Sequence, residues 1–140
     1  MTLIVDTSVA LKWVVAEDGS DRAATFLGGD LVAPELLLSE LGNALWKKVR
    51  QGEIGALHAT AAFAEIEAWL PIVTTLPASA RGLEIALTLD HPVYDCLYLA
   101  LAEMTGWKVL TADRRLIANC RDTAFAALLA SLDDADPPDV

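Results

Sequence analysis

The fold is decided by Thr2-Leu3-Ile4-Val5-Asp6-Thr7-Ser8, a short apolar run that ends at an acid and two hydroxyls. Its β-rich composition predicts a buried strand, because continuous apolar runs of this length are typical of strands covered on both faces. Residues 107–111 form a second such run, and Asp113 follows it closely. Two strands that end near acids predict a parallel sheet whose carboxyl edge carries a site.

Helical spacing alternates with short strand-like runs along the rest of the chain. We expect helices over residues 8–16, 21–27, 35–51, 56–70, 78–89, 92–104 and 113–120, and further strands over 31–32 and 72–76. Pro34 is expected to open the third of these helices, and residues 125–132 fit either a helix or a last strand. The alternation predicts an α/β fold with a mostly parallel central sheet of four to five short strands flanked by helices.

The length of 140 residues fits one domain, and a hydrophobic fraction of 54% argues against intrinsic disorder. We expect a single domain over 1–132 and an acidic flexible tail over 133–140. No apolar stretch reaches the roughly 18 residues of a spanning helix, and no basic segment typical of a signal peptide opens the chain. Cys96 and Cys120 form no ligand pattern. A cytoplasmic protein with reduced thiols and no membrane association is therefore expected.

Four acids occupy positions that a soluble fold does not usually give to charged residues. Asp6 and Asp113 each follow a predicted strand, Glu40 interrupts the apolar face of a predicted helix, and Asp95 is the only charge in residues 93–102. Each acid taken singly fits an ordinary structural role, as a helix-capping acid or a carboxylate that reaches solvent. Converging on one site, four carboxylates would repel one another and need divalent cations, and oxygen ligands favour Mg²⁺ or Mn²⁺.

Other polar residues near these acids are candidates for supporting roles. Ser8, Asn43 and Thr111 are expected to hold the ligands or their waters in place. The sequence offers no Ser/His/Asp triad, and we expect His58 and His91 to be structural or surface residues.

The segments that carry these acids resemble PIN-domain ribonucleases, and specifically the VapC toxins of type II toxin–antitoxin pairs. The resemblance is carried by Ile4-Val5-Asp6-Thr7-Ser8, by residues 34–45, by His91-Pro92-Val93-Tyr94-Asp95 with the apolar run to Ala102, and by Val109-Leu110-Thr111-Ala112-Asp113. Their order and spacing match the family from residue 2 to about residue 132. Each motif is short and weak alone, whereas four in order within one domain are specific.

The resemblance implies a PIN-like fold and a metal-dependent endoribonuclease that hydrolyses phosphodiester bonds in RNA. It places the catalytic, Mg²⁺- or Mn²⁺-binding acids at Asp6, Glu40, Asp95 and Asp113. An additional acid that some relatives carry just beyond the fourth is absent, because residues 114–115 are both arginine. This departure puts a second metal site in doubt.

The resemblance also implies partners, namely a cognate antitoxin that neutralises the toxin and a second copy of the chain in a homodimer. Large apolar side chains are typical anchors of such interfaces. The candidates are Trp13, Phe26, Trp46 and Trp69, each of which could equally be a core aromatic.

A formal charge of −10 argues at first against an RNA substrate. Four of the acids are assigned to the site, however, and four more lie in the tail, which leaves twelve acids against ten basic residues. Basic residues that could contact RNA phosphates are Lys12, Lys47, Arg114 and Arg115, although solvated surface charge is the usual role of such residues.

Two other functions remain open at this level. Asp6 at the end of the first strand could be the nucleophile of a haloacid-type phosphatase, but that chemistry expects a second acid where Ser8 stands. A PIN-like fold could also be a catalytically weak binding module that acts through a protein or DNA partner. The presence of all four acids counts against that loss.

Overall fold

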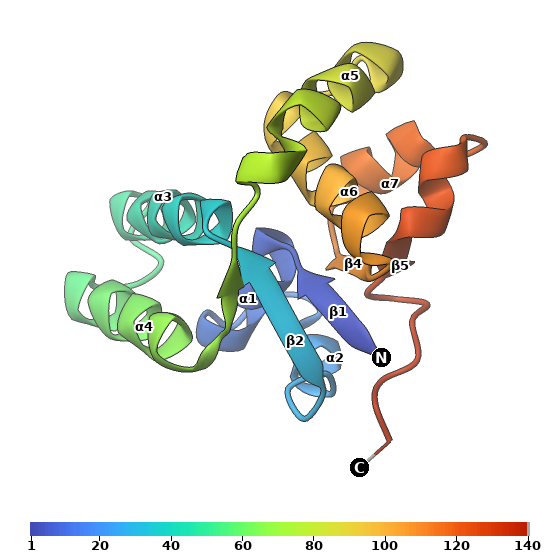
Figure 1. Cartoon of the computed structure of the whole chain (residues 1–140). Helices are drawn as coiled ribbons and strands as arrows, with labels where there is room; N and C mark the ends of the chain where they lie inside the picture. Colours follow the sequence, from blue (N-terminus) through green and yellow to red (C-terminus); the bar gives the residue numbers. More distant parts are fainter. Residues whose placement is uncertain (140) are drawn as a thin grey trace.

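The computed structural model describes residues 1–139 as an α/β fold (Figure 1). Its strands are β1 (Thr2–Val5), β2 (Asp30–Pro34), β3 (Ile72–Val73), β4 (Lys108–Thr111) and β5 (Leu129–Ser131). Its helices are α1 (Thr7–Val14), α2 (Ser20–Ala24), α3 (Leu36–Arg50), α4 (Ala56–Trp69), α5 (Ser79–Leu89), α6 (Val93–Thr105) and α7 (Arg114–Cys120), with 3-10 turns η1 (Leu76–Ala78) and η2 (Ala124–Leu128).

The strands form one five-stranded sheet in the order β3-β2-β1-β4-β5, and every pairing in it is parallel. The central strand β1 pairs with β2 on one side and with β4 on the other. All strands therefore end at the same edge, where parallel sheets of this kind place their sites. The expected sheet of four to five parallel strands is confirmed.

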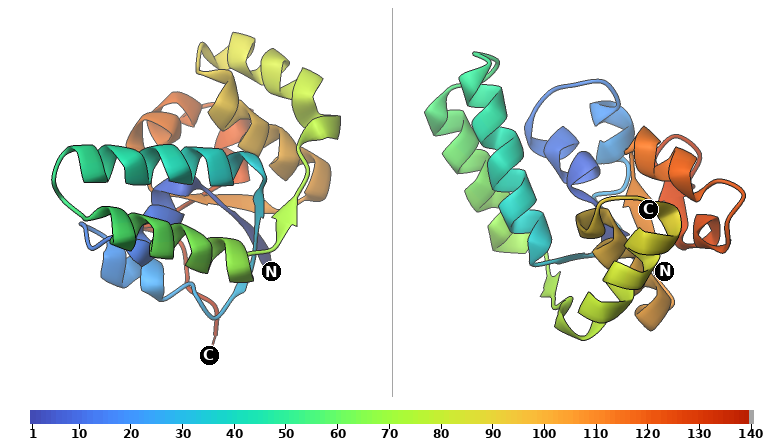
Figure 2. Two further views of the ribbon diagram at one scale, coloured as in Figure 1. Left: turned by 90° about the vertical axis from the view of Figure 1, so that its left-hand side faces the viewer. Right: turned by 90° about the horizontal axis from the view of Figure 1, so that it is seen from above.

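Helices cover both faces of this sheet, as the apolar character of the strands predicts. Leu3 and Val5 pack on one face with residues of α1, α2, α3 and α4. Ile4 points to the opposite face, where Tyr98 and Leu101 of α6 cover it. Figure 2 shows the α3–α4 pair well separated from the α5–α6 pair. The core therefore lies in two layers, one on each side of the central strands.

Two expected boundaries are wrong. Pro34 is the last residue of β2, paired with Val73, instead of the first residue of a helix. A proline is tolerated there because the N–H that it lacks is not needed at the end of a strand. The strand expected over 72–76 ends at Val73, since the Glu35 carboxylate accepts hydrogen bonds from the N–H and the hydroxyl of Thr75.

The end of the chain contains both elements that the sequence left open for residues 125–132. The 3-10 turn η2 comes first, and β5 then adds an edge strand beside β4. Beyond it, Ala135 packs against the core, and the Arg22 guanidinium donates to the carbonyls of Leu132 and Ala135. Residue 140, the last of the expected tail, lies outside the described residues.

No helix within residues 1–139 combines the length and the apolar character needed to cross a bilayer.

Candidate active site

Four acidic side chains approach one another at the carboxyl edge of the sheet. Asp6 follows β1 and Asp113 follows the paired strand β4, while Glu40 comes from α3 and Asp95 from the first turn of α6. Besides burial, the charges of Asp95 and Glu40 raise the pKa of Asp6, and those of Asp95 and Asp113 raise the pKa of Glu40. The structure thus brings together all four acids singled out in the sequence.

Asp6 is the most deeply placed of these acids, with only 4% of its surface exposed. Its pKa is raised to about 6, chiefly by burial and also by the charges of Asp95 and Glu40, against the opposing effect of two hydrogen bonds. Desolvation disfavours the charged form of a carboxyl, which is why burial acts in this direction. Above that pH, Asp6 is a buried anion that favours a cationic partner.

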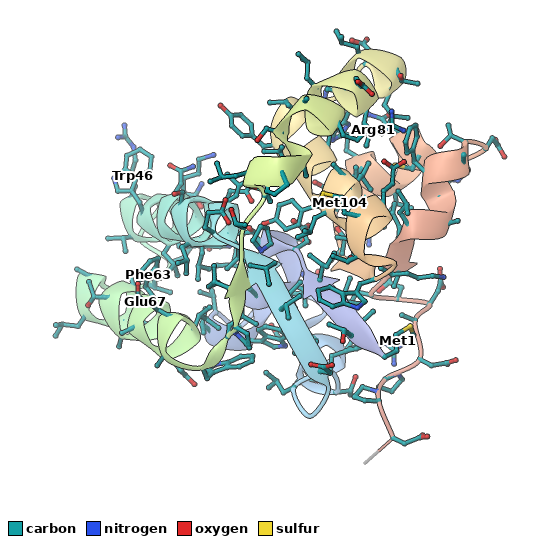
Figure 3. The ribbon with its side chains drawn as sticks, viewed as in Figure 1. Met1, Trp46, Phe63, Glu67, Arg81 and Met104 are labelled. Atoms are coloured by element: carbon teal, nitrogen blue, oxygen red, sulfur yellow. The ribbon has the colours of Figure 1, made fainter. Side chains whose placement is uncertain are left out.

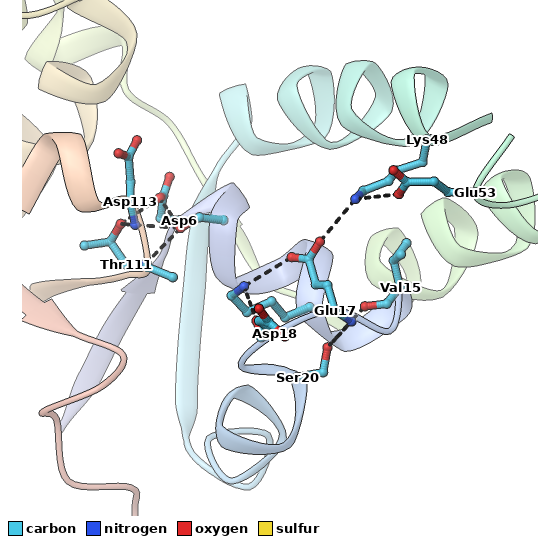
Figure 4. A network of polar contacts seen from close by, with 12 residues as sticks. Asp6, Val15, Glu17, Asp18, Ser20, Lys48, Glu53, Thr111 and Asp113 are labelled. Carbon is cyan, nitrogen blue, oxygen red and sulfur yellow. Dashed lines mark hydrogen bonds and ion pairs between the residues drawn. The ribbon is translucent and has the colours of Figure 1, made fainter. Parts of the chain in front are cut away.

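Two hydroxyls hold one oxygen of Asp6. Ser8 Oγ donates to Asp6 Oδ2 at 2.6 Å and Thr111 Oγ1 donates to the same oxygen at 2.8 Å. Each hydroxyl also accepts a backbone N–H beyond β4, from Ala112 at 3.0 Å and from Asp113 at 3.0 Å. Figure 4 shows Asp6, Thr111 and Asp113 gathered at the strand ends. Ser8 and Thr111 therefore join the ends of β1 and β4 while they orient Asp6.

Glu40 is held in a similar way by two residues that no motif of the sequence indicated. Tyr98 Oη donates to Glu40 Oε1 at 2.8 Å, and Thr7 Oγ1 donates to the same oxygen at 3.1 Å. Burial, together with the negative charges of Asp6 and Glu40, raises the pKa of Tyr98 far above its usual range. The phenol therefore stays protonated and remains a donor.

The last two acids each have one oxygen held as well. His91 Nε2 lies 2.6 Å from Asp95 Oδ2. Asp113 caps α7, where its Oδ1 accepts the N–H groups of Arg115 at 3.0 Å and Leu116 at 3.1 Å. An aspartate at the N-cap is a common structural feature, and here the cap leaves Oδ2 of Asp113 without a hydrogen bond from residues 1–139.

A single pattern thus describes all four acids. In each, one carboxylate oxygen accepts hydrogen bonds from protein donors, and the other accepts none from the described part of the chain. No lysine or arginine within that part forms an ion pair with them. One oriented and one open oxygen on each acid is an arrangement suited to binding a hard divalent cation.

Residues 3–122, which include all four acids, match the PIN domain family. The chain belongs to the PIN domain family. Its similarity to VapC proteins is confirmed by "Ribonuclease VapC3" of Pyrobaculum aerophilum, which is 35% identical over 121 residues, 83% of this chain and 92% of the relative.

Solved PIN-domain structures agree in fold. The crystal structure of PAE2754 from Pyrobaculum aerophilum has a TM-score of 0.71 at 24% identity and covers 95% of this chain and 93% of its own. VapBC-1 from nontypeable Haemophilus influenzae has a TM-score of 0.61 at 12% identity, covering 96% of this chain and 100% of its own. At these identities the likeness concerns the fold alone.

Some of the sequence-predicted site residues lie outside the PIN domain's cluster of acids. Asn43 is exposed on α3, and its side chain forms no hydrogen bond with residues 1–139. Lys12 donates to Glu17 at 3.2 Å and to the carbonyl of Asp18, so it is not free for a phosphate. Lys48 extends this ion-pair network to Glu17, which Figure 4 shows apart from Asp6 and Asp113.

The remaining basic candidates differ in their distance from the acids. Arg114 and Arg115 are exposed in the first turn of α7, directly after Asp113. Lys47 is exposed two turns beyond Glu40 on α3, about 10 Å further along the helix axis. The arginines are therefore better placed than Lys47 to meet a phosphate near the acids.

The donor set fits a hard divalent cation in chemistry, although its ligands are not closed into a cage. Every open position is a carboxylate oxygen, the ligand type that Mg²⁺ and Mn²⁺ prefer. As they are placed, no three His, Cys, Asp or Glu side chains among residues 1–139 form a ready metal-binding group. The charges of the neighbouring acids contribute, after burial, to the raised pKa values of Asp6 and Glu40.

Proposed function

We propose that this PIN domain is a metal-dependent endoribonuclease of the VapC type, which hydrolyses phosphodiester bonds in RNA with Mg²⁺ or Mn²⁺. The proposal assigns metal binding and catalysis to Asp6, Glu40, Asp95 and Asp113. It also makes the chain the toxin of a toxin–antitoxin pair, neutralised by a cognate antitoxin. We also place the activity in the cytoplasm, where Cys96 and Cys120 would remain reduced thiols.

The observation that carries the proposal is the shared arrangement of the four acids. A buried structural acid normally has its charge balanced by a cation or satisfied by hydrogen bonds. Here each carboxylate keeps one open oxygen, and burial together with the nearby acids raises the pKa of Asp6 and Glu40. The "ribonuclease" in the name of the VapC3 relative supports the choice of RNA as substrate.

The chain's own residues have distinct roles in this mechanism. A divalent cation, when bound, supplies polarisation of the phosphodiester and activation of the attacking water. Ser8 and Thr111 fix the orientation of Asp6, and Tyr98 fixes that of Glu40, so little rearrangement of the carboxylates is needed during the reaction. Arg114 and Arg115 supply positive charge beside Asp113 for the RNA backbone.

The direct test is cleavage of a mixed-sequence RNA by the purified chain with Mg²⁺ or Mn²⁺, and with a chelator. We expect Asp95→Asn to reduce cleavage at least about 100-fold, a loss typical of removing one key electrostatic group. Asp21→Asn is the matched control, because Asp21 also lies in the first turn of a helix but is exposed and distant from the acids. Cleavage that persists in Asp95→Asn and in chelator would contradict the proposal and favour a contaminating nuclease or a binding module.

We place the antitoxin on an apolar groove between α3 and α4. The groove has a volume of about 400 Å³ and is lined by Gly42, Leu45, Trp46, Val49, Ala56, Ala59, Thr60 and Phe63. Trp46 is 54% exposed, and Figure 3 shows it at the outer surface of α3, with Phe63 between α3 and α4. Exposed tryptophans in such grooves are typical anchors for a partner.

The other aromatic candidates are less suited to that role. Phe26 is fully buried in the core, which favours the role of core aromatic over that of interface anchor. The Trp13 ring lies 5.5 Å from that of Trp69, and its indole N–H donates to Ala23 O at 2.8 Å. We therefore assign the antitoxin contact to Trp46.

Growth measurements test the proposed antitoxin independently of the RNA-cleavage assay. Expression of this chain should arrest growth, and co-expression of the reading frame beside its gene should restore it. Trp46→Ala should weaken that restoration while the chain still cleaves RNA. An unchanged restoration in Trp46→Ala would rule out the groove, and the absence of any arrest by the intact chain would rule out the toxin role.

A further inference from the structure

His91 is a buried histidine next to the acid cluster, with 5% of its surface exposed. It follows Asp90, which ends α5 in the left-handed conformation at φ 51°, and it precedes Pro92, where α6 begins. Its backbone N–H donates to the carbonyl of Ala86 at 3.2 Å. The backbone on both sides of His91 is thus constrained, which fixes the starting point of its side chain.

Both ring nitrogens of His91 have partners, and the partners determine where the proton lies. Nδ1 is 2.7 Å from the amide nitrogen of Asn119, and Nε2 is 2.6 Å from Asp95 Oδ2. An amide nitrogen can only donate, so Nδ1 accepts. The proton of the neutral imidazole then sits on Nε2 and points at the carboxylate of Asp95.

Asn119 connects the His91–Asp95 contact to the helix that carries Asp113 at its start. It lies on α7, the same helix whose first turn is capped by Asp113. Asn119 therefore links α7 to the loop before α6, and through His91 to Asp95. The His91 ring and the Asn119 amide thus connect Asp95 on α6 to α7, the helix that Asp113 caps.

We propose that His91 is a positioning residue for Asp95, held in its Nε2–H tautomer by Asn119. By donating to Oδ2 it fixes the orientation of the carboxylate and leaves Oδ1 without a hydrogen bond from residues 1–139. This role rests on the proposed function, because it matters only if Asp95 binds a cation. Hydrogen bonds to a ligating carboxylate orient it before the cation arrives, and losing such a partner typically lowers metal affinity 10–100-fold.

The tautomer gives a readout that does not depend on activity. Long-range ¹H–¹⁵N correlation spectra of the metal-free protein should place the proton of His91 on Nε2. Asn119→Leu removes the amide donor at similar volume, so we expect the Nδ1–H form to become populated in that variant. A wild-type spectrum with the proton of the neutral ring on Nδ1 would overturn the assignment.

The expected effect of His91 on metal affinity is tested by titration with Mn²⁺, without RNA, followed by electron paramagnetic resonance. His91→Phe removes the donor at similar volume and should weaken Mn²⁺ binding at least about 10-fold. His91→Gln keeps an amide donor and should recover part of that loss, which a merely space-filling role would not predict. The matched control is His58→Phe, because His58 is exposed on α4 and should leave affinity unchanged.

The possible results distinguish a failure of the positioning role of His91 from a failure of the proposed nuclease function. If wild type binds Mn²⁺ and His91→Phe, shown to be folded by its thermal transition, binds it equally tightly, the positioning role is wrong and the proposed nuclease stands. Should His91→Phe fail to fold, Asn119→Leu takes its place, and a Mn²⁺ affinity in Asn119→Leu equal to that of wild type would overturn the role. If wild type itself binds no Mn²⁺, the proposed function fails first and the positioning role with it.

Discussion

At the scale of single residues, the site combines two opposing demands on Asp6. The fold buries this carboxyl at the end of a central strand, and the function requires it to be charged. Ser8 and Thr111 offset part of the cost by donating to one oxygen, but the pKa of Asp6 still rises to about 6. Without a cation, the charged site is a source of instability, as is common where function needs buried charge.

This conflict predicts that Asp6→Asn stabilises the metal-free protein at alkaline pH. A carboxyl whose pKa is raised from 3.8 to about 6 binds its proton more tightly in the folded state. Wild-type stability should therefore fall as pH rises between those values and stay low above about pH 6. Since one pH unit is worth about 1.4 kcal/mol, Asp6→Asn should gain up to about 3 kcal/mol at pH 8 and little at pH 4.

Urea unfolding in chelator at both pH values measures this difference. Asp21→Asn, an exposed aspartate on α2, should show no such dependence on pH. Added Mg²⁺ should then raise the stability of wild type but not that of Asp6→Asn. An Asp6→Asn protein that is no more stable than wild type at pH 8 would contradict the stated cause of the raised pKa.

Tyr98 gives a second prediction at this scale. Tyr98→Phe removes a donor to Glu40 and leaves Thr7 as the remaining one. Because that hydrogen bond lowers the pKa of Glu40, its loss should raise this pKa and weaken Mn²⁺ binding about 10-fold. Stability should change by only about 1 kcal/mol, the usual net value of one hydrogen bond. Mn²⁺ affinity is the measurement, and equal affinity in wild type and Tyr98→Phe would exclude a role for the phenol.

At the scale of elements, periodicity predicted the sheet and the acids, but not the groups that orient them. Strands β1 and β4 were predictable because an apolar run followed by an acid is typical of a strand end in an α/β chain. The Tyr98 donor to Glu40 was not, since the two residues are 58 positions apart, and neither was the Asn119 partner of His91, which is 28 positions from it. In the sequence, Tyr98 and His91 look like ordinary members of an apolar helix and its preceding loop.

Individual long-range contacts also account for the errors in the short elements. Residues 74–76 have β-branched composition, yet the Glu35 carboxylate takes the N–H of Thr75 that a strand would use. Residues 124–128 form a 3-10 turn before a short edge strand. Segments of two to five residues are decided by such contacts, which no local pattern contains.

Helix α6, which carries Asp95, packs closely on α5, and this contact gives a prediction for a whole element. A Cβ at Gly82 would lie 2.7 Å from Leu97 Cδ2 and 3.3 Å from Leu97 Cγ. Gly82→Val should therefore push α5 away from α6 and destabilise the fold by about 1–3 kcal/mol. Ala80→Val is the control, since Ala80 is exposed on the same helix and carries only the cost of a β-branched side chain. Equal urea midpoints for the two variants would show that the helices can separate freely.

At the scale of the whole molecule, the net charge of −10 has an uneven distribution. The four acids of the site form no ion pair with a Lys or Arg among residues 1–139, whereas Lys12, Lys48 and Arg81 are matched by acids on the surface. RNA would therefore meet its strongest repulsion at the site itself, where a divalent cation would neutralise it. Binding of RNA and binding of the cation should support each other for this reason.

We propose that the homodimer implied by the resemblance to VapC toxins forms through the outer face of α5. Leu83 and Leu87 are exposed on this helix, and Leu76 in η1 continues the apolar surface. Figure 1 shows α5 at the rim of the molecule. At about 16 Å, α5 alone is too short to bury the roughly 800 Å² per partner of a stable interface. The contact should therefore also include the exposed Tyr94 at the start of α6.

Sedimentation velocity tests this association directly. We expect wild type to sediment as a dimer at micromolar concentrations and the Leu83→Asp/Leu87→Asp double variant as a folded monomer, because buried carboxylates without partners are costly. Leu57→Asp is the control, since Leu57 is even more exposed than Leu83 and Leu87 but lies on α4. The α5 interface is excluded if the double variant remains dimeric or if Leu57→Asp alone produces monomers. Because Leu83 and Leu87 are neither site acids nor donors to them, the monomer should bind Mn²⁺ like wild type, and a parallel loss of affinity would mean that the dimer contact also shapes the site.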